Sequence, residues 1–382
     1  MQRVLHFVIR FVIHFVIHFV IQHVMHSEYN LKQLYMLLEN NNNKAITNLK
    51  IALDNDLNEE ITNAENSTCF TLKPMNDWIE DAKNRPIPYM LFSELWYENE
   101  ICILFADTNL GKSILALQIS NSISKGIPIY GFKNEVPAQK VLYFDFELSD
   151  KQIENRYSKS YSERYVFNDN LIRVEINPDQ EVSAKFKDFE DFLCSSLEAA
   201  IIKTKAKIIV IDNITYLNNN TEKAKDALPL MKFLNSIKKK YGLSILVLAH
   251  TPKRDSSKPL SKNDLSGSKM LINFCDSCFA IGESIQRNGL RYIKQIKQRN
   301  TELIYDIENV IICTIEKQSN FLEFVFDSHD DEIEHLKPRS TSDQLSEIIK
   351  LKNQGLNNVD IGTQLGISEG TVRNKIKKAD NI

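Results

Sequence analysis

Four short apolar runs occur between residues 101 and 250, and each is apolar at successive positions. They are ICILFA (101–106), KVLYFDF (140–146), KIIVID (207–212) and SILVLAH (244–250). This pattern is typical of strands that are buried on both faces, as in a parallel sheet. The segments between the runs include residues 115–125 and 227–241, whose apolar residues follow helical spacing. Alternating strands and helices predict an α/β domain with a mainly parallel central sheet.

A different pattern follows later in the chain, where SCFAIGES and LRYIKQIKQ flank Asn288-Gly289. Asn-Gly is a strong hairpin signal, so these two segments predict an antiparallel pair. Outside these segments, the stretches before residue 89 and after residue 328 differ in composition from the α/β part. We therefore expect a repetitive segment at 1–26, an Asn-rich lead-in at 27–88, the α/β domain at 89–328, a linker at 329–341 and a helical unit at 342–382.

The helical unit at the end of the sequence has the spacing of three short helices. Thr341 and Gln344 have capping-box spacing at the start of the first helix, and Gly355 ends it. Gly366 suits the tight turn before the third helix, and Ser368 suits its N-cap. The second helix is expected near 359–365, and the small core would contain Ile361, Leu365, Ile367, Val372 and Ile376.

The third helix of this unit carries a basic face. Its exposed residues would be Thr371, Arg373, Asn374, Lys375, Lys377 and Lys378. The unit resembles the helix-turn-helix of response regulators and sigma factors, which implies that this helix contacts duplex DNA. A helical protein-docking module is the alternative. One half-site per chain would bind weakly, and several copies in an oligomer would add avidity.

The chain begins with a tetrapeptide repeat, HFVIRFVIHFVIHFVI, at residues 6–21. Residues 4–21 are long enough to cross a bilayer, which takes roughly 20 apolar residues, but Arg10 and the histidines oppose insertion. As a strand the repeat would be prone to aggregation. A repeat of four residues implies repeated DNA, so our hypothesis is that upstream DNA is read as protein and that the working start is Met25 or Met36. A membrane or surface anchor and a real structural element are the alternatives.

Composition excludes one class of nucleic-acid-binding protein. The 382 residues include 47 basic and 50 acidic ones, for a formal charge of −3. Binding by bulk positive charge is therefore excluded, and any DNA contact must come from local patches. Most of the six cysteines lie in apolar runs, which favours a reducing, cytoplasmic location. Cys275 and Cys278 form a single C-x-x-C, with too few further ligands for zinc.

A phosphate-binding loop is predicted directly after the first apolar run. The sequence ADTNLGKS (106–113) fits G-x-x-x-x-G-K-[ST], except that Ala106 replaces the first glycine, so a backbone angle restricted to glycine would be lost there. Loop amides and the following helix N-terminus favour an anion. Lys112 would reach the β- and γ-phosphates of ATP, and Ser113 would ligate Mg²⁺. The nucleotide-binding residues would be Ala106, Asp107, Thr108, Asn109, Leu110, Gly111, Lys112, Ser113 and Ile114; a turn that contains GKS by chance is the alternative.

Three polar residues at the ends of the other runs complete the predicted ATP site. Asp212 occupies the Walker B position, where a carboxylate holds Mg²⁺. The next residue is Asn213, so the catalytic glutamate must come from elsewhere, and Glu147 at the end of a neighbouring strand would orient or deprotonate the attacking water. Asp145 is a weaker candidate. His250 would sense the γ-phosphate, or it is a surface histidine at a strand end.

These motifs, in order, resemble RecA-type P-loop ATPases over about residues 90–328. Within them the chain looks similar to the RepA-like and DnaB-like hexameric helicases, among the AAA family ATPases of mobile elements. The resemblance implies ATP bound between subunits, commonly in rings, with a basic finger supplied by a neighbour. Lys297 and Arg299 in KQIKQRN match the family's K-x-R finger. A solvated basic strand face is the alternative.

The family also binds single-stranded DNA with loops that face the ring channel. The polar stretch at 252–269 follows the sensor strand, and its basic residues Lys253, Arg254, Lys258, Lys262 and Lys269 would track phosphates. Without an aromatic residue such binding should be electrostatic and salt-sensitive, and a flexible surface loop is the alternative. We therefore expect a cytoplasmic, DNA-dependent ATPase that forms a homo-oligomer such as a hexamer. It would be a replicative helicase or loader of a plasmid or mobile element, or a DNA-binding regulator or mobilisation factor that unwinds nothing.

Overall fold

The computed structural model describes residues 51, 70–177, 179–182, 184–216, 224–252, 254–265, 269–337, 341–365 and 367–379, with backbone alone at 224–227, 269–270, 341–344 and 378–379. The HFVI repeat, Met25, Met36 and most of the predicted lead-in, up to residue 69 apart from residue 51, lie outside the described residues. The chain divides into two compact units, Met1–Pro86 and Ile87–Ile382. In the first, helix α4 (Met75–Lys83) is described, and none of its residues is buried.

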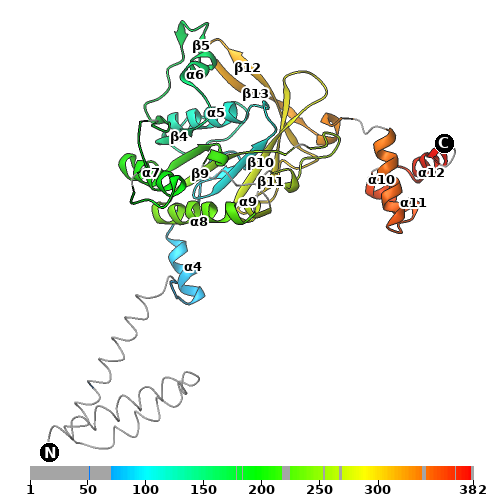
Figure 1. Ribbon diagram of the computed structural model, residues 1–382, viewed down its shortest axis with the longest axis horizontal. Helices are drawn as coiled ribbons and strands as arrows, with labels where there is room; N and C mark the ends of the chain where they lie inside the picture. The colour runs from blue at the N-terminus through cyan, green and yellow to red at the C-terminus, as the bar shows by residue number, and fades with distance from the viewer. Residues whose placement is uncertain are drawn as a thin grey trace, which may run out of the picture. The chain divides into compact units, whose positions relative to one another are not determined.

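The second unit contains one large sheet, in the order β13-β12-β11-β10-β3-β9-β8-β4-β7 within the described residues (Figure 1). The parallel part consists of β3 (Ile101–Ala106), β4 (Val141–Asp145), β7 (Leu171–Val174), β8 (Ile208–Asp212), β9 (Ser244–His250) and β10 (Ser277–Glu283). The antiparallel part adds β11 (Leu290–Lys297), β12 (Val310–Gln318) and β13 (Phe321–Asp330). The predicted α/β class with a mainly parallel central sheet is confirmed, and the four predicted strands are present.

Helices cover both faces of the sheet, which explains why the central strands are apolar except at some of their end positions (Figure 1). Leu104 of β3 belongs to the core that includes helix α5 (Lys112–Lys125). Its neighbour Ile103 belongs to the core on the other face. That second face is covered by α7 (Phe189–Thr204), α8 (Ala224–Tyr241) and α9 (Lys269–Phe274). All six residues of β3 are buried as a result.

Shorter elements complete this unit. Strand β1 (Met90–Phe92) pairs with β2 (Trp96–Tyr97), and β5 (Ser158–Lys159) pairs with β6 (Glu163–Arg164) after helix α6 (Asp150–Arg156). Three single-turn 3-10 helices lie within the described residues: η1 (Ile214–Tyr216), η2 (Lys262–Asp264) and η3 (Glu332–His335). In the part of the chain that the structure describes, every helix is too short or too polar to cross a membrane.

Two antiparallel hairpins extend the parallel sheet. The predicted pairing of β10 with β11 is confirmed, with Gly289 at a φ of 83° in the connection. The β12–β13 hairpin was not predicted. It packs on α5 through Gln118. The Gln118 side chain donates a hydrogen bond of 2.9 Å to the carbonyl oxygen of Phe324 and accepts one of 2.9 Å from its amide. The hairpin therefore supports the helix that begins at the predicted phosphate loop.

The predicted linker at 329–341 begins too early. Strand β13 continues to Asp330, and η3 contains two buried polar residues, Glu332 and His335. The Glu332 carboxylate accepts hydrogen bonds from the Leu260 amide at 2.6 Å and from Lys294 Nζ at 2.5 Å. Charged residues that are buried with a partner have the same sequence pattern as a solvated linker, so the error follows from pairing that composition does not reveal.

The C-terminal part contains three helices, α10 (Thr341–Asn353), α11 (Asn358–Leu365) and α12 (Glu369–Ala379). Its small core contains Ile348, Leu351, Ile361 and Val372, with Leu356, Leu365, Ile367 and Ile376 packed against them. Ser368 Oγ accepts a hydrogen bond of 3.2 Å from the Thr371 amide, so the predicted N-cap is present. Gly366 and the side chains of Thr341 and Gln344 lie outside the described residues.

Candidate nucleotide-binding site

The predicted phosphate loop connects the end of β3 with the start of α5. Ala106 is a strand residue that pairs in register with His250 of β9, and positive φ angles occur later, at 64° for Asn109 and 96° for Gly111. A Cβ atom on Gly111 would lie 2.8 Å from Ile315 Cδ1 and 2.9 Å from Phe324 Cε2. Glycine is therefore required at 111, whereas extended backbone accepts alanine at 106. The predicted loss of a glycine-only angle at Ala106 is not found.

Lys112 is held at the mouth of this loop. Its Nζ donates hydrogen bonds of 3.0 Å to the carbonyl oxygens of Ala106 and Asp107, and the residue is only 7% exposed. Burial lowers the pKa of Lys112, while the carboxylates of Asp212 and Glu147 oppose that effect. The first turn of α5 contains no acidic residue, so its amides and helix dipole favour an anion. The loop can therefore offer the ammonium group and the helix N-terminus to a phosphate.

Asp212 and Ser113 form a candidate magnesium site beside this loop. Asp212 is 1% exposed, and its Oδ2 accepts a hydrogen bond of 2.8 Å from the Tyr143 hydroxyl. Among the described residues its Oδ1 has no hydrogen-bond partner. Burial raises the pKa of Asp212 to about 6, against the opposing effect of the Ser113 and Tyr143 hydroxyls. A buried carboxylate oxygen without a donor, next to a serine hydroxyl, fits the oxygen ligands that Mg²⁺ prefers.

Glu147, Asn213 and His250 meet at the carboxyl ends of three strands. The Asn213 amide nitrogen contacts Glu147 Oε1 and lies 3.0 Å from His250 Nε2. His250 Nε2 is 3.5 Å from Glu147 Oε1. The hydrogen bond with His250 is the main cause that lowers the pKa of Glu147, with further help from the charges of His250 and Lys112 and opposition from burial. The structure thus brings the predicted base and the predicted sensor together, in a form that favours the carboxylate.

Asp145, the weaker candidate, has a structural role. Its Oδ1 accepts hydrogen bonds from the amides of Glu147 at 3.1 Å and Leu148 at 2.9 Å, and its Oδ2 accepts one of 2.9 Å from Arg173 Nε. These bonds shape the turn that presents Glu147. They also leave Asp145 poorly placed to activate water, because both of its oxygens already have donors.

Sequence reasoning missed three residues of this site: Tyr143, Arg173 and the linking role of Asn213. Each acts through a partner at least 28 positions away, such as Asp145 for Arg173. The one available signal was position: Asn213 directly follows Asp212, where a catalytic acid is common, and an amide there can bridge two neighbours.

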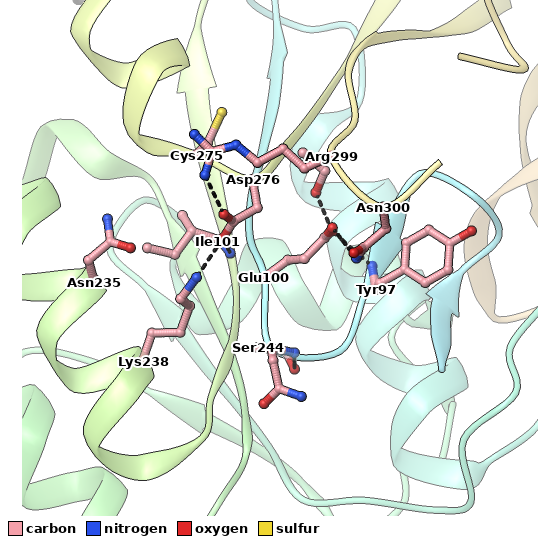
Figure 2. A network of polar contacts seen from close by, with 12 residues as sticks. Tyr97, Glu100, Ile101, Asn235, Lys238, Ser244, Cys275, Asp276, Arg299 and Asn300 are labelled. Carbon is pink, nitrogen blue, oxygen red and sulfur yellow. Dashed lines mark hydrogen bonds and ion pairs between the residues drawn. The ribbon is translucent and has the colours of Figure 1, made fainter. Parts of the chain in front are cut away.

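Lys297 and Arg299 lie at the opposite end of the sheet from the phosphate loop of the same chain. Lys297 Nζ donates to the carbonyl oxygens of Ile272 at 2.5 Å and Cys275 at 2.6 Å. Arg299 donates to Asp276 Oδ1 at 2.9 Å (Figure 2). Asp276 also binds the amide of Ile101, the first residue of β3, whose six residues span about 16 Å. The structure therefore does not bring this pair to its own nucleotide site.

The predicted DNA-contacting residues of the loop at 252–269 differ in how free they are. Arg254 is only 12% exposed; its Nε is 3.8 Å from Asp264 Oδ1, and its Nη2 contacts the Lys258 carbonyl oxygen. Lys258 and Lys262 are exposed, and Lys258 Nζ lies 3.6 Å from Glu347 Oε1 and 3.8 Å from Asp255 Oδ2. Lys253 and the side chain of Lys269 lie outside the described residues. Arg254 packs within the loop, so it offers less to a phosphate than its sequence position predicts.

Helix α12 exposes three of the six residues predicted for its basic face. Arg373, Asn374 and Lys377 are exposed, and Lys375 is half-buried. Thr371 is also half-buried, and its hydroxyl lies 2.9 Å from Ser368 Oγ as part of the helix cap. The Lys378 side chain lies outside the described residues. A contact of this helix with DNA stays a prediction.

Comparison with known proteins gives one family match. Residues 69–256 match the family model of an AAA domain, a span that contains the phosphate loop, Glu147, Asp212 and His250 and ends before Arg299. The search of curated proteins found no match. Among solved structures, a KaiC-like protein of the hyperthermophilic archaeon Pyrococcus horikoshii OT3 is 15% identical, with 60% of this chain and 91% of that chain covered and a TM-score of 0.42. The site geometry and the family match support a P-loop ATPase.

Proposed function

We propose that the chain is a DNA-dependent ATPase, and that it serves as a RepA-like replicative helicase or helicase loader of a plasmid or mobile element. The observation that supports it most is the Glu147–Asn213–His250 cluster above the phosphate loop. Glu147 is a carboxylate with a lowered pKa in contact with His250 at the end of β9. This arrangement suits a motor in which hydrolysis changes the conformation of the loop that follows β9.

The residues of the site divide the chemistry of hydrolysis. Lys112 would donate hydrogen bonds to oxygens of the β- and γ-phosphates after leaving the loop carbonyls. Glu147 would orient a water molecule and accept its proton as the oxygen attacks the γ-phosphorus. Ser113 and Asp212 would hold Mg²⁺, which supplies positive charge to the phosphates when bound. His250 would sense the γ-phosphate through its contact with Glu147 and Asn213.

Completion of this site is proposed to require a second copy of the chain. Arg299 is 54% exposed and lies at the far end of β3 from its own phosphate loop. A neighbouring protomer in a ring, such as a hexamer, would present Arg299 and Lys297 to the γ-phosphate. Positive charge there would stabilise the transition state.

DNA would be bound at two places. Lys258 and Lys262, exposed on the loop after the sensor strand, would contact phosphates of single-stranded DNA. Helix α12, with Arg373, Asn374 and Lys377 exposed, would contact duplex DNA as the third helix of a helix-turn-helix. The exposed basic face of α12 also favours a second candidate function, an ATP-responsive DNA-binding regulator or mobilisation factor that does not unwind DNA.

Measurement of ATP hydrolysis with and without single-stranded DNA tests this proposal. We expect DNA to stimulate hydrolysis by the full chain, and Glu147→Gln to lower kcat by roughly 10²- to 10³-fold while nucleotide still binds. Lys112→Ala should lose nucleotide affinity as well. A strand-displacement assay then separates the two candidates. Nucleotide binding with negligible turnover on any DNA would reject the helicase and leave the regulator.

A further inference from the structure

We infer that Asp276 is a positioning residue for Arg299, and that it connects the finger offered to a neighbour with the strand that carries the chain's own phosphate loop. The inference rests on the proposed function, since it takes Arg299 to act on nucleotide held by a second copy. It goes beyond that function by assigning a role to a carboxylate that does not touch the nucleotide in either protomer.

Asp276 lies at the turn between α9 and β10 and holds three donors (Figure 2). Its Oδ2 accepts hydrogen bonds from the Ile101 amide at 2.9 Å and from Lys238 Nζ at 2.6 Å. Its Oδ1 accepts one of 2.9 Å from Arg299 Nη1. The Asp276 side chain is 14% exposed, whereas that of Arg299 is 54% exposed. Asp276 is thus a nearly buried anchor for a cation that remains accessible to a partner.

The guanidinium group is fixed at two points. Besides Asp276, Arg299 donates through Nη2 to the Asn273 carbonyl oxygen at 3.1 Å. Lys297 holds the same turn from the strand side, through the carbonyl oxygens of Ile272 and Cys275. Both predicted finger residues therefore form hydrogen bonds with the turn that contains Asp276. An arginine that is already oriented loses less side-chain freedom when it binds a phosphate.

The same cluster is joined to the first residues of β3. The amide of Ile101 is bound by Asp276, and the preceding Glu100 accepts a hydrogen bond of 2.7 Å from Asn300 Nδ2 (Figure 2). Glu100 also accepts a hydrogen bond of 2.7 Å from Ser277 Oγ. Residues 100–101 therefore hold both the segment of Asp276 and the segment of Arg299. Since β3 ends at Ala106, a shift of this strand on nucleotide binding would reach the finger that the same chain presents to its neighbour.

A purely structural role for Asp276 makes a different prediction. If Asp276 acted only through its shortest ion pair, with Lys238, whose side chain is 13% exposed, loss of that pair alone would lower activity as much as loss of the Asp276 charge. Lys238→Met removes this partner and leaves the Arg299 contact in place. It is therefore the matched control for Asp276→Asn, which keeps an acceptor oxygen but removes the charge that holds Arg299.

The test combines single variants of the full chain with mixed oligomers. Asp276→Asn and Arg299→Ala should each lower kcat for ATP at least tenfold, with KM within twofold of the original. Lys238→Met should keep kcat within threefold. Each finger variant is then mixed with Lys112→Ala, which lacks a working phosphate loop but has an intact finger. In equal mixtures about a quarter of head-to-tail interfaces would combine a working loop with a working finger, so activity should reappear.

The outcomes separate the inference from the function on which it rests. Recovery in both mixtures supports it, because an unfolded Asp276→Asn protomer would not supply a working loop. Recovery with Arg299→Ala but not with Asp276→Asn overturns the positioning role and leaves the finger in place. So does a loss of kcat in Lys238→Met equal to that in Asp276→Asn. If Arg299→Ala is fully active, or its mixture stays inactive, the finger in trans is itself wrong and the inference falls with it.

Discussion

The free energy of unfolding of the Glu100→Gln variant, relative to that of the original protein, should increase as pH rises from 5 to 8. Glu100 is 3% exposed, and burial is the main cause that raises its pKa from the usual 4.5 to about 7, with hydrogen bonds from Ser277 and the Tyr97 amide in opposition. Between pH 4.5 and about 7, Glu100 therefore keeps its proton in the folded protein but has released it in the unfolded chain. Stability from this group is fully present below pH 4.5 and is lost as pH rises through about 7.

The size of the effect follows from the two pKa values. A rise from 4.5 to about 7 corresponds to about 3 kcal/mol of lost stability once Glu100 is ionised in both states. Glutamine does not ionise and so has no such loss of stability, but its side chain has one acceptor oxygen, whereas Glu100 offers two to its hydrogen-bond donors. The absolute change at one pH mixes these effects. The difference between the two proteins should still grow by about 2 to 3 kcal/mol between pH 5 and pH 8.

Urea denaturation followed by Trp96 fluorescence measures this difference. Trp96 is fully buried beside Tyr97, whose amide donates to Glu100 at 3.1 Å. The chain has two tryptophans, so a Trp78→Phe background makes Trp96 the sole reporter. Free energies of unfolding would be compared at several pH values for that background with and without Glu100→Gln. Two parallel stability curves would refute the reasoning, since they would show that Glu100 ionises at the same pH in both states.

Three further outcomes are expected. Gly111→Ala should lose about 1 to 3 kcal/mol of stability and bind nucleotide more weakly, because the φ of 96° at position 111 and the nearby Ile315 side chain both oppose a Cβ atom. Ala106→Gly is the control; it should lose under about 1 kcal/mol of stability and hydrolyse ATP at an unchanged rate. Mg²⁺-dependent nucleotide binding should weaken about tenfold per pH unit below the Asp212 pKa of about 6, and a titration with and without chelator should show no such trend for Asp212→Asn. His250→Ala should move the acidic limb of the kcat/KM profile to higher pH, because His250 is the main cause that lowers the pKa of Glu147; an unmoved limb would contradict this assignment.

The central sheet could be predicted because its strands are buried on both faces. A run such as ICILFA has no polar position at which the pattern becomes ambiguous, and β3 was predicted with its observed bounds. The phosphate loop was also predictable, since its residues act through local backbone geometry. Gly111 takes its positive φ, and Lys112 follows at the start of α5. Contacts within one turn join residues that are close in sequence, so a local sequence pattern is enough to predict them.

The polar contacts that complete the site could not be predicted in the same way. Glu332 resembles a linker residue until its partner Lys294, 38 positions away, is known. Asn213 gave no sign that its amide would lie between Glu147 and His250, from two other strands. Such residues have ordinary polar neighbours in sequence, and burial with a distant partner is what gives them a role.

Strand β3 has a different role at each end, and its sequence shows only one of them. Its carboxyl end leads into the loop of Gly111 and Lys112. Its amino end is held by Asp276, beside Arg299, about 16 Å away along the strand. A side chain at that end does not reach a phosphate at the other end of the same strand. If Arg299 contributes to hydrolysis, a lone protomer is therefore incomplete, and turnover depends on a neighbour whose own strand sets where that arginine lies.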